Sequence, residues 1–186
     1  MIFKEKNTVR GFTERRAFDK FGNPKKMFQS NFIWKLIKKL FGADWQIPFV
    51  TGFWTFNPIV DNLVVTRGKQ IIASQINGVT AAPVTAIAIG IGTTAAAATD
   101  TALQSEITTN GGARGAATTS NVTTSTTLDT AQWVKTFTFT GDFAVTEEGL
   151  LDNNVSGGNL LSHQVFAAYN VVSGDSIAFT HKLQLT

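Results

Sequence analysis

Cysteine is absent from this 186-residue chain, and histidine occurs only twice. The lack of cysteine excludes a disulfide framework, a thiolate metal site and a cysteine nucleophile, although it does not indicate a cellular compartment. Because the two histidines, His163 and His181, show no H-x-x-x-H spacing, a zinc site has few ligands to draw on. The sequence therefore predicts a protein with no metal centre and no catalytic cysteine.

Long hydrophobic runs are also missing. The most apolar of the later stretches, residues 81–98, is interrupted by Pro83, Gly90, Gly92 and several threonines. The first residues carry charge but have no apolar segment behind them. A signal peptide or a membrane span is therefore not expected.

Acidic residues are scarce in the first third of the chain, and basic residues are scarce in the rest. Residues 1–69 hold 13 Lys and Arg against five acids, a net charge of +8, whereas residues 70–186 hold three against eight, a net charge of −5. The first third also contains ten of the 15 Phe and three of the four Trp. A chain polarised in this way is expected to have a partner for its basic, aromatic part.

Residues 1–60 are predicted to form an extended basic arm that contains one short helix at 31–41. The apolar residues of this helix recur at helical spacing from Ile33 to Phe41, Ser30 or Asn31 can cap it, and Gly42 ends it. Docking on the chain's own domain, contact with another protein and contact with a membrane are all compatible with such a helix, and docking is the simplest. Deletion of residues 1–60 is expected to leave a folded domain.

Residues 43–60 are rich in aromatic side chains without a regular period. Such residues are typical of interface centres and also of ordinary cores, and the sequence alone does not separate the two. Apolar and basic residues of the arm are the predicted assembly interface: Trp34, Lys35, Lys38, Lys39, Phe41, Trp45, Phe49, Phe53 and Trp54.

Residues 61–186 are predicted to form a mainly β domain, an antiparallel β-sandwich or a jelly roll, which begins with a helix near 66–77. Trp133, Phe137 and Phe139 alternate with polar residues at the period of two that marks a half-buried strand. Turn residues separate further segments of strand length. The expected strands are 84–91, 114–128, 131–140, 143–150, 160–169 and 176–185.

A glycine motif at Gly90-Ile-Gly92-Thr-Thr-Ala95 matches part of the dinucleotide-binding fingerprint. That fold also needs a second apolar strand ending in an acid about 20 residues on, and residues 108–127 are polar and small instead. The motif is therefore interpreted as a glycine turn that leaves a strand, and no cofactor is expected.

Paired carboxylates raise the question of glycoside hydrolysis, because four acids fall between Asp142 and Asp152. Glu147 and Glu148 are consecutive, so on a strand they point to opposite faces and cannot act on one bond. One of them is expected to be solvated and the other to pair with Arg114, with Arg114 and Glu147 as the preferred ion pair. His181 lies in an apolar stripe and is predicted to be a hydrogen-bonded core or interface histidine.

Several short segments, in this order, carry a resemblance to known proteins. They are Asn62-Leu63, Arg67–Ala73, Ala86–Thr94, Thr99–Ile107, Arg114, Phe137–Phe139, Val145–Leu150, Gly157-Gly158 and Gly174–Ile177. In these segments the chain resembles virion structural proteins of tailed bacteriophages, found among tail, fibre, neck and head-attached components. The resemblance covers about two-thirds of the chain and leaves the arm mostly outside it. It implies a symmetric building block without catalytic site or cofactor.

The expected function is that of a non-enzymatic structural component of a tailed-phage virion, a homo-oligomer such as a trimer or ring. The arm would anchor it to other virion proteins, and no small-molecule substrate or membrane partner is expected. An alternative within the same class is a receptor- or glycan-binding module whose loops, such as 152–158, contact the host. Nucleic-acid contact through the basic arm is disfavoured because no recognised binding module is present.

Overall fold

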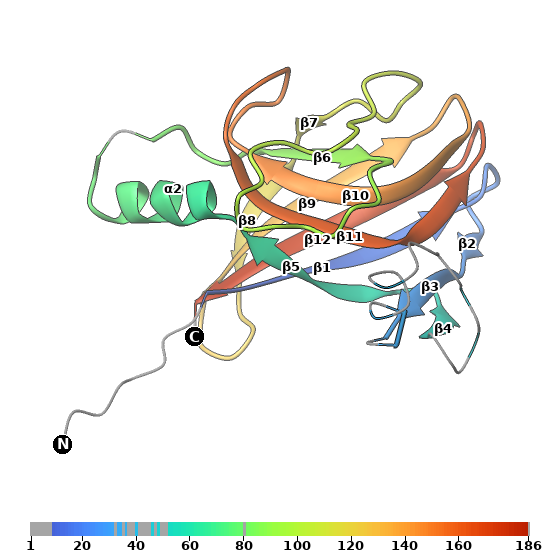
Figure 1. Cartoon of the computed structure of the whole chain (residues 1–186), viewed down its shortest axis with the longest axis horizontal. Coiled ribbons are helices and arrows are strands. Elements are labelled where there is room, and N and C mark those ends of the chain that lie inside the picture. Colours follow the sequence, from blue (N-terminus) through green and yellow to red (C-terminus); the bar gives the residue numbers. More distant parts are fainter. Residues whose placement is uncertain are drawn as a thin grey trace.

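The computed structural model describes residues 9–31, 33, 34, 36, 40, 46, 48, 52–79 and 81–185. It is mainly β, as predicted, with antiparallel strands and one described helix of eleven residues (Figure 1). The elements are β1 (Val9–Phe18), β2 (Pro24–Lys25), β3 (Met27–Ser30), β4 (Gly52–Thr55), β5 (Ile59–Val64), α2 (Thr66–Ile76), β6 (Ala86–Gly90), β7 (Gly115–Ala116), β8 (Thr118–Val122), β9 (Thr130–Thr138), β10 (Phe143–Leu151), β11 (Leu160–Val171) and β12 (Ser176–Leu185).

Ten of the strands form a single sheet in which neighbours are hydrogen-bonded in the order β7-β6-β10-β11-β5-β1-β12-β9-β8, with β2 attached to β1. The two ends of this order adjoin, because only Ala117 separates β7 from β8. The sheet therefore curls until it is nearly barrel-shaped (Figure 1). The indole N–H of Trp133 donates to the carbonyl of Val84 (2.7 Å) and ties β9 to the segment before β6 at this seam.

The sequence predicted an edge strand at 114–128, and the structure places two short strands there instead. β7 pairs with β6, and β8 pairs with β9. The polar composition of this segment is compatible with the arrangement because the side chains of Thr118–Asn121 are exposed. The strands predicted in the rest of the domain are found within a few residues of their expected bounds.

Residues 9–18 differ from the prediction of an extended arm. They form β1, an inner strand that pairs along its whole length with β12 and through Gly11–Glu14 with β5. The predicted boundary at residue 60 falls inside β5. Deletion of residues 1–60 would therefore remove an inner strand, so that deletion cannot test attachment separately from folding.

The interior of the curled sheet is a hydrophobic core joined to a polar cluster. Phe137, Phe166 and Phe179 pack against one another, with ring centroids 5.8 and 6.3 Å apart in the two pairs that share Phe179. A second, smaller sheet of β3 and β4 lies outside and contacts β11 through Phe28 and Ala167.

Both predicted helices are present, the first of them in its described residues. In the first, Ile33, Trp34, Leu36 and Leu40 are helical, and the other residues of 31–41, apart from Asn31, lie outside the described part of the chain. The Asn31 side chain accepts hydrogen bonds from the N–H groups of Ile33 and Trp34, as expected of a helix cap.

The second predicted helix is α2, which ends as predicted at Asn77-Gly78, where Gly78 has a φ of 73°. It packs on β11 through Gly68. A Cβ there would lie 2.0 Å from the carbonyl oxygen of Leu161, so only glycine allows this contact.

Candidate functional site

Strand β10 carries two adjacent carboxylates, and each is at the centre of a buried polar cluster. Glu147 points to the outer face, beneath the segment 91–107, and Glu148 points into the interior of the sheet. The predicted opposite orientation of the two side chains is confirmed. The expectation that one of them is solvated is wrong, because both are fully buried.

The outer cluster is built around the Glu147 carboxylate, which accepts three backbone hydrogen bonds. The N–H groups of Gly92 and Ser105 donate to Oε1 at 2.9 and 2.8 Å, and that of Gln104 donates to Oε2 at 3.0 Å. His163 Nε2 lies 3.0 Å from Oε2. One carboxylate therefore fixes the segment that covers this face of the sheet.

The glycine motif that resembles a nucleotide fingerprint is explained by this carboxylate. A Cβ on Gly90 would lie 2.3 Å from Glu147 Oε1, and one on Gly92 would lie 2.6 Å from the same atom. Glycine at both positions lets the backbone approach the carboxylate, the same physical reason that glycines serve near a pyrophosphate. Here the anion is a side chain of the chain itself.

His163 joins Glu147 to a second carboxylate. Its Nδ1 lies 2.7 Å from Oδ2 of Asp100, which also accepts the N–H of Ala97 at 2.8 Å. Burial opposes the charged imidazolium, but the hydrogen bonds to Glu147 and Asp100 prevail, and the pKa of His163 is raised. Burial also opposes the Glu147 carboxylate, yet the hydrogen bonds from His163 and the three N–H groups hold the pKa of Glu147 below its ordinary value.

These shifts predict how stability depends on pH. A histidine with a raised pKa contributes stability that is complete below its unfolded pKa of 6.5 and is lost as the pH rises through the folded value. A glutamate with a lowered pKa contributes stability above its unfolded value of 4.5 that is lost as the pH falls through the folded value. The outer cluster is therefore expected to stabilise the fold most between about pH 4.5 and 6.5.

Urea unfolding at a series of pH values checks this expectation. Above pH 6.5, the free energy of unfolding of the wild-type protein should fall more steeply than that of His163→Gln. Equal slopes for the two proteins would show that His163 does not gain a proton on folding.

The inner cluster is built around His181, whose ring nitrogens contact groups on four other strands. Nδ1 lies 2.9 Å from Oε1 of Glu148 and 3.0 Å from the hydroxyl of Thr13. Nε2 lies 3.1 Å from the hydroxyl of Ser162 and also contacts the amide nitrogen of Asn62. His181 is fully buried and hydrogen-bonded, as predicted from its place in the apolar stripe.

Ser162, His181 and Glu148 contact one another as hydroxyl, imidazole and carboxylate do in a serine-hydrolase triad. The side-chain nitrogen of Asn62 can only donate, so with the amide in this orientation Nε2 accepts and Nδ1 carries the proton toward Glu148. The Nε2 lone pair is thus shared between Asn62 and Ser162, and all three triad residues are fully buried. The arrangement joins β1, β5, β10, β11 and β12 through side-chain contacts.

Arg15 adds a cation to the same interior. Its guanidinium carbon lies 3.8 Å from the centre of the Phe166 ring. Burial lowers the pKa of Arg15 to about 9, although Glu148 acts in the opposite direction. Nε and Nη2 are buried without a hydrogen-bond partner. The contact with the Phe166 ring therefore offsets only part of the free-energy cost of burying the Arg15 charge.

The predicted ion pair between Arg114 and Glu147 is not formed. Arg114 binds both carboxylate oxygens of Glu106 through Nε and Nη2, and its Nη1 donates to the carbonyl of Gly157 at 2.6 Å. Glu147 is already saturated by His163 and the backbone, and Glu106 pairs with Gly90 near the end of β6. Arg114 thus braces the base of the loop 152–158 and does not stabilise Glu147.

The predicted interface residues fall into three groups. Trp34 is buried against Phe28 and Ala167, so its packing within the chain explains it. Phe53 and Trp54 lie on β4 and are exposed. The remaining ones lie outside the described residues: Lys35, Lys38, Lys39, Phe41, Trp45 and Phe49.

Comparison with known proteins gives no match: no family model, no curated protein and no solved structure is similar to the chain. None of the described helices is long and apolar enough to cross a membrane. Within the described part of the chain, His, Asp and Glu side chains form no group of three suited to a metal ion.

Proposed function

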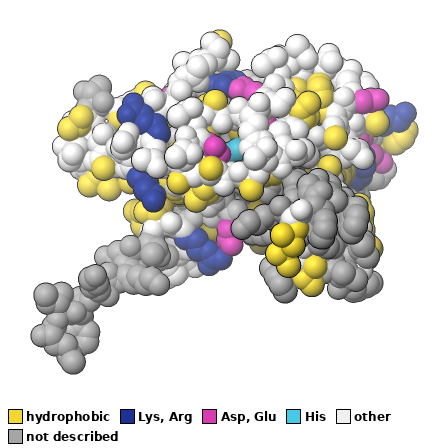
Figure 2. Space-filling view, viewed as in Figure 1, with side chains coloured by type: hydrophobic (Ala, Val, Ile, Leu, Met, Phe, Trp, Pro, Cys, Tyr) yellow, Lys and Arg dark blue, Asp and Glu magenta, His cyan; other side chains and the backbone are white. Residues whose placement is uncertain are grey.

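We propose that the chain is a non-enzymatic structural subunit of a tailed-phage virion, attached to neighbouring virion proteins through an aromatic surface at β4. The observation that carries this proposal is the exposure of apolar residues over a short stretch. Phe53, Trp54, Phe56 and Ile59 are 53, 46, 46 and 52% exposed. Figure 2 shows hydrophobic side chains in this part of the surface. We call these four residues the β4 patch.

The chemistry of the β4 patch is that of a protein interface. Aromatic residues are enriched at interface centres, and exposed apolar patches on soluble domains mark interaction sites. Lys26 lies 5.5 Å from the centre of the Phe56 ring and places a positive charge beside the patch. An apolar surface with an acidic rim is the complementary partner.

The buried clusters support a structural role. Glu147 and His181 join distant segments and lie beneath the surface, where they hold the sheet together. Loop 152–158, the alternative receptor- or glycan-contacting site, is braced by Arg114 and closed by the hydrogen bond from Asn159 N–H to Asp152. A glycan array with the whole chain distinguishes this alternative, which requires a specific sugar signal.

Substitution within the β4 patch tests attachment without removing β1. Phe53→Ser/Phe56→Ser removes two exposed rings, so the folded state should be retained, as judged by circular dichroism and thermal unfolding. The variant is expected to be lost from purified phage particles, measured by quantitative mass spectrometry after complementation of a gene deletion.

Ile76→Ser is the matched control, because Ile76 is 78% exposed at the end of α2, outside the β4 patch. It should enter particles at the wild-type level. Incorporation of Phe53→Ser/Phe56→Ser at that same level would refute attachment through the β4 patch.

A further inference from the structure

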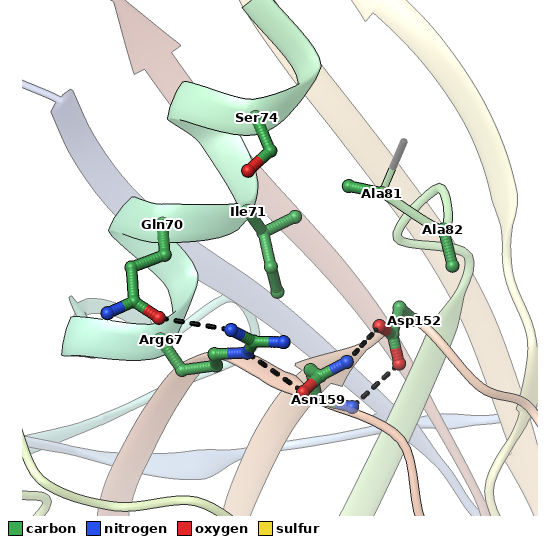
Figure 3. Close-up of a pocket in the computed structure, with 8 residues that line it drawn as sticks. All are labelled: Arg67, Gln70, Ile71, Ser74, Ala81, Ala82, Asp152 and Asn159. Carbon is green, nitrogen blue, oxygen red and sulfur yellow. Dashed lines mark hydrogen bonds between the residues drawn. The ribbon is translucent and has the colours of Figure 1, made fainter. Parts of the chain in front are cut away.

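A cavity of about 190 Å³ lies between α2 and the segment that follows it (Figure 3). Arg67 and Ile71 line it from α2, Ala81 and Ala82 line it from the following segment, and Asn159 lines it from the position just before β11. This volume is below the roughly 300–1,000 Å³ of pockets that hold drug-sized ligands. It therefore suits a small chemical group rather than a nucleotide or a sugar chain.

Arg67 is an exposed residue whose guanidinium donates to two side-chain acceptors. Its Nε donates to the side-chain oxygen of Asn159 at 2.9 Å, and Nη1 donates to that of Gln70 at 3.1 Å. Asn159 is itself fixed, since its backbone and side-chain nitrogens donate to the two oxygens of Asp152 at 2.6 and 2.7 Å. Figure 3 shows this series of contacts beside the cavity.

The guanidinium has donor capacity left over. It carries five N–H groups, and the two contacts use one each from Nε and Nη1. Among the described residues, no carboxylate lies within ion-pair distance of Arg67 or of Arg15, whereas Arg10, Arg16 and Arg114 all have such a partner. An oriented arginine with free donors is typical of a site for a planar anion.

We propose that this cavity binds a carboxylate group that carries a short apolar chain. The carboxylate would accept hydrogen bonds from the Nη atoms of Arg67, and the apolar part would contact Ile71, Ala81 and Ala82. A phosphate dianion fits less well, because Asp152 adds negative charge to the same cavity and no second cation lines it.

Two sources present this chemistry, a free short-chain acid and the C-terminal carboxylate of a peptide. The site lies on α2 and uses no residue of the β4 patch, so a result that refutes one proposal does not refute the other.

Titration of the ¹⁵N-labelled whole chain with butyrate, followed by NMR, tests the site. We expect saturable shifts in the amides of α2 and Ala82, and a roughly tenfold or greater loss of affinity in Arg67→Gln, because a bidentate charged contact is removed. Arg16→Gln, which alters an exposed arginine on β1, should bind butyrate as the wild type does. The unliganded spectra of both variants show whether the fold is retained.

Titration with peptide probes identifies the source of the carboxylate. A short peptide with a free C-terminus that binds more tightly than butyrate, while its amidated form does not bind, assigns the site to a chain terminus. Butyrate binding without peptide binding assigns it to a free acid. The absence of saturable shifts with both probes would overturn the proposal, as would equal affinity in Arg67→Gln or tighter binding of inorganic phosphate.

Discussion

Glu147→Ala is expected to lower the free energy of unfolding by about 3–5 kcal/mol, among the largest effects of any single substitution in the chain. The substitution leaves the N–H groups of Gly92, Gln104 and Ser105 without their acceptor, and His163 without one of its two carboxylates. Each buried donor that loses its partner costs about 1–3 kcal/mol. Urea unfolding of the purified variant measures the loss.

Glu147→Gln refines the test because it keeps the shape of the side chain. Its amide oxygen can still accept from part of the segment 91–107, but its NH₂ group faces donors on the other side. A loss of about 1–3 kcal/mol is expected, smaller than for alanine. Asp61→Ala is the matched control, since its ion pair with Arg10 is exposed and should contribute about 0–1 kcal/mol. A loss below that of the control in Glu147→Ala would contradict the role of the carboxylate.

His181→Ala is the second substitution expected to have a large effect, again about 3–5 kcal/mol. The imidazole is the one group that contacts Thr13, Asn62, Glu148 and Ser162 together, so its removal leaves the Glu148 carboxylate buried with fewer donors. Gln164, which donates to Glu148 at 2.8 Å, compensates only in part. Thermal and urea unfolding measure the effect.

A double-mutant cycle separates the contact between His181 and Glu148 from the cavity that alanine creates. Glu148→Gln combined with His181→Ala should cost less than the sum of the single changes, with a coupling of about 0.5–3 kcal/mol. Lys182→Ala, at the next residue of β12, removes a partly exposed side chain and should change stability by about 0.5 kcal/mol or less. Strict additivity would show that the two side chains act independently.

The sequence predicted the strands of the later part of the chain well because apolar residues recur at every second position in them. The residues of β12 that face the interior are Ile177, Phe179, His181 and Leu183, and the period of two is evident. The interior residues of β1 are Gly11, Thr13, Arg15 and Ala17, which are small or polar. Patterning could not detect a strand whose buried face completes a polar cluster.

The two clusters were foreseen only in part. Opposite directions for Glu147 and Glu148 follow from consecutive positions on a strand. The partners do not, because Asp100 reaches His163 across 63 positions and Thr13 reaches His181 across 168. The remaining signal in the sequence was a matching number of residues. The chain has two histidines and two adjacent glutamates, one histidine for each glutamate. The ion pair of Arg114 was misassigned for a different reason: Glu106 is close in sequence, but the two side chains meet only once the segment after β6 has folded back.

The interior of the sheet explains why the front of the chain cannot be a separate attachment arm. Thr13, Arg15 and Asn62 come from the first third and complete a cluster whose other members lie beyond residue 147. The described residues of the first third that are exposed on the outside of the folded unit include the β4 patch. In the proposed function, attachment and folding would therefore use different residues of the same segment.

Imaging of an intact tailed-phage particle that carries this chain, at a resolution that traces side chains, tests the proposed function most directly. The account predicts repeated copies of the folded chain in the particle, with Phe53, Trp54 and Phe56 buried against a neighbouring subunit. Particles that lack the chain, or copies whose β4 patch faces solvent, would contradict it.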